Sequence, residues 1–431
     1  MFISRYTNRQ IAGTRPSGGM LGLAVMVLLV GACTVSSKDP SRTSGPPLDV
    51  VPGSRTTVVE AGTAGYAMFR IPVLVRAPNG DLLLFGEARR TASDFGNIDV
   101  VQFRSTDRGR TWSGPVVVAD NGSDTAADMA AVVEEGEVHL LYQQRPGNRD
   151  FGDYLKRGVS DARGLHIVST DNGQTWSVPD TITSQVLPEA DEQLPMFGPN
   201  NGIVLDSGRL VAPMYYANQS TETFTPAVIY SDDGGTTWTR SEDAVTGESV
   251  NETAVVQVPN GDLFAVARDD SGDDNDQKRF FRSTNRGSTW VETGDLHPAI
   301  PAVSCQQSMR ARGNRLFLAG PTKRSRRDGR LWTGTYAPDR SGGVDWRAEG
   351  LQVTRGGFAY SAMVIQDSTL HLVYEDNVDG TYEALRYVRV RGAVSPSARN
   401  GDSTGRSRAP LSNEGGRFSS VRPISRSGAG R

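Results

Sequence analysis

Cysteine and histidine are scarce in this chain. Its 431 residues include two cysteines, Cys33 and Cys305, and four histidines. If Cys33 carries a lipid, Cys305 has no partner, so we expect no disulfide framework. The histidines show no pairing at the spacing of metal ligands. We therefore expect no metal and no cofactor, and stability has to come from a large apolar core, which a domain of this length can supply.

A strong excess of either charge is also missing. The chain holds 46 Lys and Arg against 49 Asp and Glu, which gives a formal net charge of −3. This balance does not suggest a nucleic-acid partner, because such proteins usually carry a clear excess of positive charge. Glycine, in contrast, is frequent, with 48 residues. Many tight turns fit a fold of short antiparallel strands.

No apolar run in the sequence is long enough to span a bilayer comfortably. Residues 20–30 form a short apolar stretch behind a basic one, which is typical of a targeting signal. The small residues that follow, and then Cys33, resemble the bacterial lipoprotein signal, in which the Cys is acylated. We expect a signal peptide over residues 1–32 and lipidation of Cys33. The alternative is an ordinary secretory signal cut near Ala32, and both versions predict export.

Composition divides the remaining chain into three segments. Residues 33–55 are rich in Ser, Pro, Thr and Gly, which predicts a flexible tether. Residues 56–392 are long enough for one large domain. From residue 393 on, Ser, Gly and Arg dominate, so 393–431 is predicted to be disordered. The basic residues of this tail either contact an anionic surface or are simply solvated.

One eight-residue pattern occurs four times. Its template is S-x-D-x-G-x-T-W, with Asn285 in place of the Asp in the last copy. The copies span residues 105–112, 169–176, 231–238 and 283–290. Their tryptophans recur at intervals of 52 to 64 residues. This period exceeds that of a solenoid repeat and suits a four-stranded propeller blade with long loops.

The residue types of this pattern predict a hairpin turn. The Asp can accept hydrogen bonds from turn amides, and the Gly supplies a positive φ. Thr favours the returning strand, and Trp packs between neighbouring sheets. Asn285 keeps an oxygen acceptor, so we expect the fourth copy to retain the shape of the others. We interpret all four copies as structural and not catalytic.

The repeated pattern resembles the Asp boxes (BNR repeats) of the sialidase, or neuraminidase, family. The resemblance covers roughly residues 56–392. It implies an all-β fold, a six-bladed β-propeller of four-stranded antiparallel sheets. Similar boxes occur in unrelated secreted propellers, so the functional argument rests on the motifs between the boxes.

Two motifs before the first box are similar to parts of the family's site. Residues 69–72 read F-R-I-P, which implies that Arg70 is the first of three arginines that clamp the substrate carboxylate. Residues 87–89 read E-A-R and are followed by Asp94. This arrangement resembles the family's E-x-R and later Asp, which implies that Asp94 is the acid/base and Arg89 a flanking contact.

Three positions in the middle of the chain continue the resemblance. Asp128 opens a D-M-A step similar to the family's D-P-S, whose Asp faces the N-acyl side of the sugar, although the Pro is absent here. Residues 251–253 read N-E-T, which implies that Glu252 is the partner of the nucleophile. Arg268 stands where the second arginine of the clamp belongs.

The last motifs lie beyond the fourth box. Residues 326–329 read R-R-D-G, similar to the R-x-[ND] pattern of the third arginine. Arg326 has the better spacing, and Arg327 or Arg324 is the alternative. Tyr360, followed by Ser, matches the step that carries the nucleophile. The L-V-Y-E run that ends at Glu375 implies a residue that positions the first arginine.

The chemistry of sialic acid explains this set of residues. Its anomeric carbon carries a carboxylate, which planar and permanently charged guanidiniums bind well. That anion would repel a carboxylate nucleophile in a poorly solvated site, whereas a neutral tyrosine avoids the repulsion. Glu252 would take the proton of Tyr360, and Asp94 would protonate the leaving oxygen and then activate water. Such a mechanism passes through a covalent sialyl-tyrosine, retains configuration and requires no metal.

The resemblance therefore predicts an exported exo-α-sialidase that releases terminal α-linked sialic acid from glycoproteins, glycolipids or oligosaccharides. We expect a monomer at the cell surface, held to the membrane only by its lipid anchor, or otherwise a secreted protein. Three alternatives stay open. The chain could bind sialoglycans without catalysis, act on a deaminated sialic acid, or transfer the sugar to a sugar acceptor. The deaminated substrate stays open because the sequence departs from the family pattern after Asp128.

Overall fold

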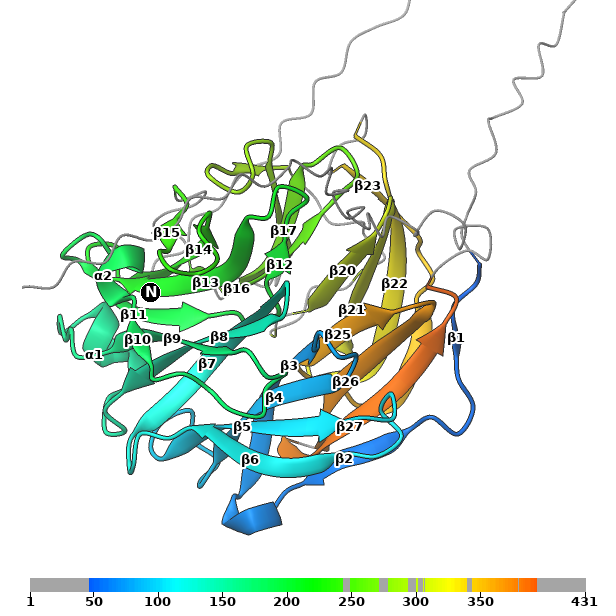
Figure 1. Cartoon of the computed structure of the whole chain (residues 1–431), viewed down its shortest axis with the longest axis horizontal. Helices are drawn as coiled ribbons and strands as arrows, with labels where there is room; N and C mark the ends of the chain where they lie inside the picture. Colours follow the sequence, from blue (N-terminus) through cyan, green and yellow to red (C-terminus); the bar gives the residue numbers. More distant parts are fainter. Residues whose placement is uncertain are drawn as a thin grey trace, which may run out of the picture. The chain divides into compact units, whose positions relative to one another are not determined.

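The structure of the chain is a computed structural model. It describes residues 46–242, 249–270, 278–293, 300, 305, 307–338, 343–378 and 380–393. The predicted signal peptide over residues 1–32, the lipidation of Cys33 and the tail from residue 394 lie outside these residues. The described part of the chain is all-β, which confirms the fold class predicted from the sequence (Figure 1).

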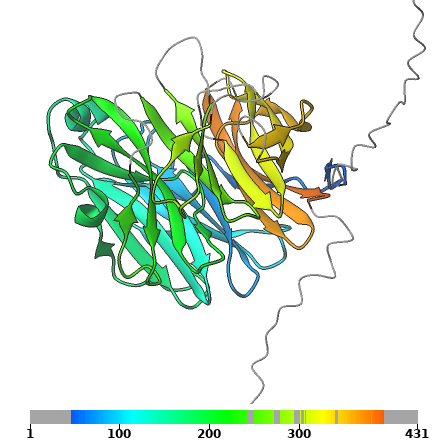
Figure 2. The same ribbon diagram turned by 90° about the horizontal axis from the view of Figure 1, so that it is seen from above.

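The strands form five sheets that lie side by side around a common centre (Figures 1 and 2). The largest sheet combines two antiparallel meanders, which meet at one parallel bridge between Ile98 and Thr125. Its first meander contains β3 (Met68–Arg76), β4 (Leu82–Arg89), β5 (Ile98–Ser105) and β6 (Ser113–Ala119). Its second contains β7 (Thr125–Glu134), β8 (Glu137–Arg145), β9 (Arg163–Ser169) and β10 (Asp180–Thr181).

Three further sheets follow in chain order. The first contains β11 (Glu192–Phe197), β12 (Ile203–Val204), β13 (Leu210–Asn218), β14 (Thr223–Ser231) and β15 (Thr239–Arg240). The second contains β16 (Val250–Gln257), β17 (Leu263–Asp269), β18 (Lys278–Ser283) and β19 (Val291–Glu292). The third contains β20 (Ser308–Arg312), β21 (Arg315–Lys323), β22 (Arg327–Tyr336), β23 (Val344–Trp346) and β24 (Leu351–Gly357).

The last sheet joins the two ends of the described chain. It contains β25 (Ser361–Gln366), β26 (Thr369–Val378) and β27 (Thr381–Arg391), together with β1 (Asp49–Val50) and β2 (Thr56–Glu60). Asp49 pairs with Arg391, and Thr56 pairs with Tyr387. The two residues of β1 belong to the segment 33–55 that composition marks as a tether, so this part of it is a strand. Composition cannot reveal a pairing partner at the far end of a chain.

The arrangement is that of a propeller. The family resemblance predicts six blades, and the number of blades in the described residues depends on whether the two meanders of the largest sheet are counted as one or two. Apolar side chains pack between neighbouring sheets. In one core cluster, Leu84 and Val101 of the first meander lie with Leu385 and Tyr387 of the last sheet. Strands such as β3 and β4 are buried on both faces, which explains their nearly continuous apolar sequence.

Each of the four boxes forms the turn between the last two strands of its sheet or meander. In the first box, Asp107 Oδ1 accepts a hydrogen bond from the Thr111 amide at 2.9 Å, and Oδ2 accepts one from the Thr111 hydroxyl at 2.7 Å. Asn285 Oδ1 accepts the equivalent bond from the Thr289 amide at 2.9 Å. The fourth box thus keeps the turn, because the amide oxygen of Asn replaces the carboxylate oxygen.

The box tryptophans pack against the preceding sheet or meander. Trp112 meets Tyr387 of β27 edge to face at 5.5 Å between ring centroids, and Trp176 meets Phe85 of β4 at 5.7 Å. Such aromatic pairs add to the burial energy of the interface. The boxes therefore stabilise the contacts between blades, as their residue types predict.

Two short α-helices contact the sheets in the described residues. α1 (Phe151–Leu155) lies in the connection between β8 and β9, and α2 (Thr183–Val186) follows β10. Asp150 and Asp153 form a capping box at the start of α1. None of the helices in the described residues is long and apolar enough to cross a membrane.

Candidate active site

The first strands of four successive sheets or meanders are irregular close to one cavity. Their pairing shifts register between Arg70 and Val73, Ala127 and Ala130, Gln193 and Pro195, and Val250 and Thr253. Ile71 and Asp128 have positive φ values of 52° and 47°. This conformation is costly, above all for a β-branched isoleucine. Bulges re-aim side chains, and here the strands that carry them turn Arg70, Asp128 and Glu252 toward one space.

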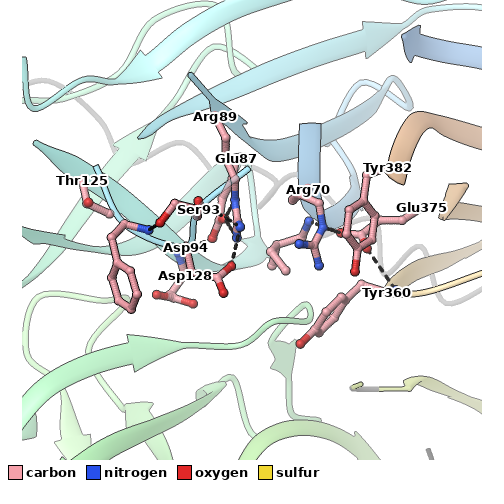
Figure 3. A network of polar contacts seen from close by, with 12 residues as sticks. Arg70, Glu87, Arg89, Ser93, Asp94, Thr125, Asp128, Tyr360, Glu375 and Tyr382 are labelled. Atoms are coloured by element: carbon pink, nitrogen blue, oxygen red, sulfur yellow. Dashed lines mark hydrogen bonds and ion pairs between the residues drawn. The ribbon is translucent and has the colours of Figure 1, made fainter. Parts of the chain in front are cut away.

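That space is a cavity of about 320 Å³. Eight of the nine residues that the sequence assigns to the site line it: Arg70, Arg89, Asp94, Asp128, Glu252, Arg268, Arg326 and Tyr360. The ninth, Glu375, is fully buried and contacts two of them from behind (Figure 3). The structure therefore brings all nine residues together, although they span most of the domain in sequence.

Tyr360 immediately precedes β25 and is the centre of the cluster. Its hydroxyl donates a short hydrogen bond to Glu252 Oε1 and accepts one from Arg268 Nη1 at 3.3 Å. Arg268 Nη1 also lies 3.3 Å from Glu252 Oε2, so the three groups form a closed triangle. Burial, followed by the charge of Glu252, raises the pKa of Tyr360 well above its ordinary value, while Arg268 and Arg326 act in the opposite direction. The phenol is therefore neutral in this state.

Arg70 is held from two sides. Its Nε donates to Glu375 Oε1 at 2.8 Å, and its guanidinium carbon lies 3.6 Å from the ring centroid of Tyr382 (Figure 3). Glu375 Oε1 also accepts a hydrogen bond from the amide of Ile71 at 2.7 Å. Glu375 Oε2 accepts one from the amide of Tyr360 at 3.4 Å. One buried carboxylate thus fixes both the first arginine and the main chain of Tyr360.

Arg326 lies in the turn between β21 and β22 with a φ of 55°. Its Nη1 donates to the Tyr382 hydroxyl at 2.6 Å, and its guanidinium lies 5.4 Å from the ring centroid of Tyr360. Arg327, the alternative for the third arginine, is the first residue of β22 and is not among the residues that line the cavity. The position of Arg326 therefore favours it over Arg327.

Asp94 lies in the loop after β4, and 57% of its side chain is exposed. Arg89 donates a short hydrogen bond to it and also pairs with the buried Glu87, with Nε 2.8 Å from Glu87 Oε2 (Figure 3). Burial alone would raise the pKa of Asp94. Arg89, then Arg70 and Arg145, outweigh this effect and hold that pKa below its usual value. Asp94 is thus ionised in the structure without substrate.

Asp128 lies at the bulge of β7 and contacts Glu87. Its amide donates to Glu87 Oε1 at 3.0 Å, and its Oδ2 accepts a hydrogen bond from Gln143 at 3.2 Å. Burial, followed by the charge of Glu87, raises the pKa of Asp128 to about 7. A carboxyl group with this pKa can both donate and accept hydrogen bonds near neutral pH.

Several cavity residues were not identified from the sequence. These are Arg145, Asp270, Tyr382 and an apolar wall of Phe151, Tyr215 and Phe224. Phe224 meets Phe151 and Tyr215 edge to face at 5.6 and 5.7 Å. None of these residues stands in a short motif. They lie in or beside different strands and at the start of α1, so they share no position or spacing by which the sequence could select them.

Several known proteins resemble this chain. Residues 96–372, more than half of the chain, match the BNR repeat-like domain. A sialidase of Bacteroides fragilis is 28% identical over 358 residues, which cover 76% of this chain and 64% of that protein. A sialidase of Micromonospora viridifaciens is 28% identical over 406 residues, which cover 85% of this chain and 59% of that protein. The chain thus spans less than two thirds of these two relatives.

A solved structure shares the fold. The sialidase of Trypanosoma rangeli, in complex with 2,3-difluorosialic acid as a covalent intermediate, matches with a TM-score of 0.64. The two proteins are 22% identical, over 80% of this chain and 59% of that one. This likeness extends to the fold, whereas the match to the family model identifies the family. The chain belongs to the BNR repeat-like domain family, and the two relatives that it resembles in sequence are sialidases.

Proposed function

We propose that this protein is an exo-α-sialidase that hydrolyses terminal α-linked sialic acid with retention of configuration. The observation that carries the proposal is the triangle of Tyr360, Glu252 and Arg268 at the wall of a cavity that Arg70 and Arg326 also line. A tyrosine hydroxyl that is hydrogen-bonded to a buried carboxylate beside a guanidinium has no evident structural purpose at the wall of a cavity. The same arrangement suits a nucleophile with its base.

The arginines would bind the carboxylate of the sugar. Arg268 and Arg326 lie beside Tyr360, and Arg70 lies 5.6 Å from the ring centroid of Tyr360. A carboxylate that accepts hydrogen bonds from these three groups places the anomeric carbon next to the Tyr360 hydroxyl. The oxygen of Tyr360 then attacks that carbon while Glu252 takes the phenolic proton. Because the phenol starts neutral, it approaches the anion without charge repulsion.

Asp94 would supply the proton for the departing oxygen. It must be protonated at that moment, whereas the arginines around it lower its pKa in the unoccupied site. A bound substrate carboxylate offsets part of the positive charge of Arg70 and so favours the protonated form of Asp94. After the leaving group departs, Asp94 takes a proton from water. The hydroxide oxygen attacks the anomeric carbon and releases Tyr360, which recovers its proton from Glu252.

The experiment uses the protein from residue 34 on, with fluorogenic α-sialosides of the N-acetyl and the deaminated type. Release of the fluorophore from the N-acetyl compound, with loss of at least about 10³-fold in kcat for Tyr360→Phe, is the expected result. A 2,3-difluorosialic acid probe should lose its anomeric fluoride and add a 3-fluorosialyl group to the wild type but not to Tyr360→Phe. No release from either sialoside would overturn the enzyme proposal.

The same experiment decides among the alternatives. Preference for the deaminated compound would assign the protein to deaminated sialic acids. Formation of a new sialoside in the presence of lactose would assign it to transfer. Binding of sialyllactose without turnover would make the chain a sialoglycan-binding propeller, and it would contradict the roles proposed for Tyr360, Glu252 and Asp94.

We also propose that the protein is exported and anchored through Cys33. The support is the order of a basic stretch, an apolar stretch and small residues before Cys33 in the sequence. The wild type expressed in bacteria should partition with membranes, and Cys33→Ser should move it to the soluble exported fraction. Unchanged partitioning of Cys33→Ser would remove the lipid anchor and leave the secretory signal.

A further inference from the structure

Arg145, at the end of β8, has an unusual environment for a buried arginine. Its side chain lines the cavity and the residue is only 2% exposed. In the described part of the chain its hydrogen bonds go to main-chain carbonyls, from Nη2 to Asp94 at 2.7 Å and from Nη1 to Arg149 at 3.0 Å. Its Nε has no hydrogen-bond partner there. A buried cation that no ion pair joins to a carboxylate among the described residues is costly, so its retention needs a reason.

Aromatic rings hold the guanidinium in place. Its carbon lies 5.1 Å from the ring centroid of Phe95 and 5.5 Å from that of Phe151. The two rings meet edge to face with centroids 5.0 Å apart. Phe95 follows Asp94 in its loop, whereas Phe151 begins α1. Arg145 therefore ties the loop of Asp94 to both β8 and α1.

The loop that carries Asp94 needs such a tie. More than half of the Asp94 side chain is exposed, and its loop extends between β4 and β5. Thr125 Oγ1 anchors the far side of the loop by a hydrogen bond to the Gly96 carbonyl at 2.7 Å. The bond from Arg145 is the contact at the Asp94 main chain itself. A general acid loses most of its effect when it is displaced by about 1 Å.

We propose that Arg145 is a positioning residue for Asp94. By holding the Asp94 carbonyl between β8 and α1, it aims the carboxyl group at the oxygen of the leaving group. This inference rests on the proposed sialidase function and deepens it. It separates the requirement for proton transfer to the leaving group, which Arg145 serves, from the requirement for nucleophilic attack, which the Tyr360 cluster serves.

The test compares two substrates that differ in their need for an acid. 4-Methylumbelliferone is a weakly basic leaving group, whereas the lactose of 3′-sialyllactose must be protonated as it leaves. We expect Arg145→Gln to lower kcat/KM by about 10²-fold on 3′-sialyllactose, the lower end of the range for general acid catalysis, and by less than about fivefold on the methylumbelliferyl sialoside. Arg145→Lys, which keeps a donor and the charge, should show a smaller loss with the same selectivity.

The matched control is Arg157→Gln. Arg157 lies in the connection between β8 and β9 that follows Arg145, but it is exposed and, among the described residues, pairs with Asp150 and Asp153. It should leave both rates unchanged. An equal loss on the two substrates in Arg145→Gln, or in Arg145→Lys if the first variant does not fold, would overturn the positioning role while the sialidase function stands. A wild type inactive on both substrates would overturn the function, and this inference with it.

Discussion

Arg70 Nε lies 2.8 Å from Glu375 Oε1, although the two residues are 305 positions apart in the sequence. Both side chains are almost completely buried, and the same oxygen of Glu375 also accepts a hydrogen bond from the amide of Ile71. The contact therefore joins β3 of the first meander to β26 of the last sheet next to the site. This pair links closure of the propeller to the geometry of the arginine cluster.

Glu375→Gln tests that link. The amide has the same shape but no charge, so Arg70 loses its counter-ion in a buried position. We expect the free energy of unfolding to fall by about 3 kcal/mol, the low end for breaking a buried pair, and kcat/KM to fall as well. Urea unfolding and sialoside kinetics measure the two effects. Glu383→Gln, an exposed site on β27, should change stability by less than about 0.5 kcal/mol. Equal effects of the two variants would argue against the buried link.

Arg326→Ala and Arg327→Ala decide which of two neighbouring arginines binds the substrate. Arg326 contacts Tyr382 in the cavity, whereas Arg327 begins β22. Loss of a charge-assisted hydrogen bond costs about 1.5–3 kcal/mol, so Arg326→Ala should lower kcat/KM by about 10- to 100-fold. Arg327→Ala should lower it by less than about threefold. The reverse order in steady-state kinetics would transfer the role to Arg327.

The buried pair of His139 and His166 should make stability dependent on pH. Their rings stack with Nδ1 of His139 3.1 Å from Nε2 of His166. Burial, and then the neighbouring His139, lower the pKa of His166 to about 4, and burial lowers that of His139 as well. The unfolded chain, with an ordinary histidine pKa near 6.5, therefore binds more protons than the folded one between these values. Stability conferred by the neutral pair is lost as pH falls from about 6.5 toward 4.

Urea unfolding of the wild type and of His166→Gln at pH 7 and pH 4.5 measures this effect. The amide of Gln can still hydrogen-bond His139 but cannot be protonated in this range. We expect the variant to be less stable at pH 7 and to lose about 1–3 kcal/mol less than the wild type on acidification, since each unit of pKa shift corresponds to about 1.4 kcal/mol. Parallel losses in the two proteins would exclude the pair as the cause.

Substitutions in the first box separate its charge from its hydrogen bonds. Asp107 accepts bonds from the Thr111 amide, the Thr111 hydroxyl and the Ser105 hydroxyl. Asp107→Ala removes them and should cost about 1–2 kcal/mol of stability. Asp107→Asn reproduces the residue found in the fourth box and should cost less than half as much. Because the box lies outside the cavity, kcat/KM should not change in either variant, and a change would show that the box affects the site.

The repeats made most of the fold accessible from the sequence. Turn chemistry at Asp107 and Asn285 is local, because a side chain binds amides three or four residues away, so the four hairpins could be predicted. Their period then suggested blades and a propeller. Strand β1 was assigned to a tether because its partner, β27, lies at the other end of the chain and leaves no trace in the local composition.

The candidate site also contains residues that the sequence could predict and residues that it could not. The residue types needed for anion binding, nucleophilic attack and proton transfer were evident, because Arg70, Glu252 and Tyr360 stand in short motifs. Tyr382 and Arg145 stand in none. Their roles arise because β27 places Tyr382 between two guanidiniums and β8 places Arg145 beside the Asp94 loop. Such contacts depend on which strands become neighbours in the fold, and a short sequence motif carries no information about that.

From the sequence alone, the box hairpins, an all-β propeller-like fold and the set of residues expected of a sialidase site could be predicted. Three features needed the folded chain: Arg326 and not Arg327 lines the cavity, Glu375 ties Arg70 to the main chain of Tyr360, and Arg145 donates to the carbonyl of Asp94. The reason is physical. Turn formation and residue chemistry are properties of short segments, whereas the direction of a side chain at a bulge or turn is fixed by packing between strands distant in sequence.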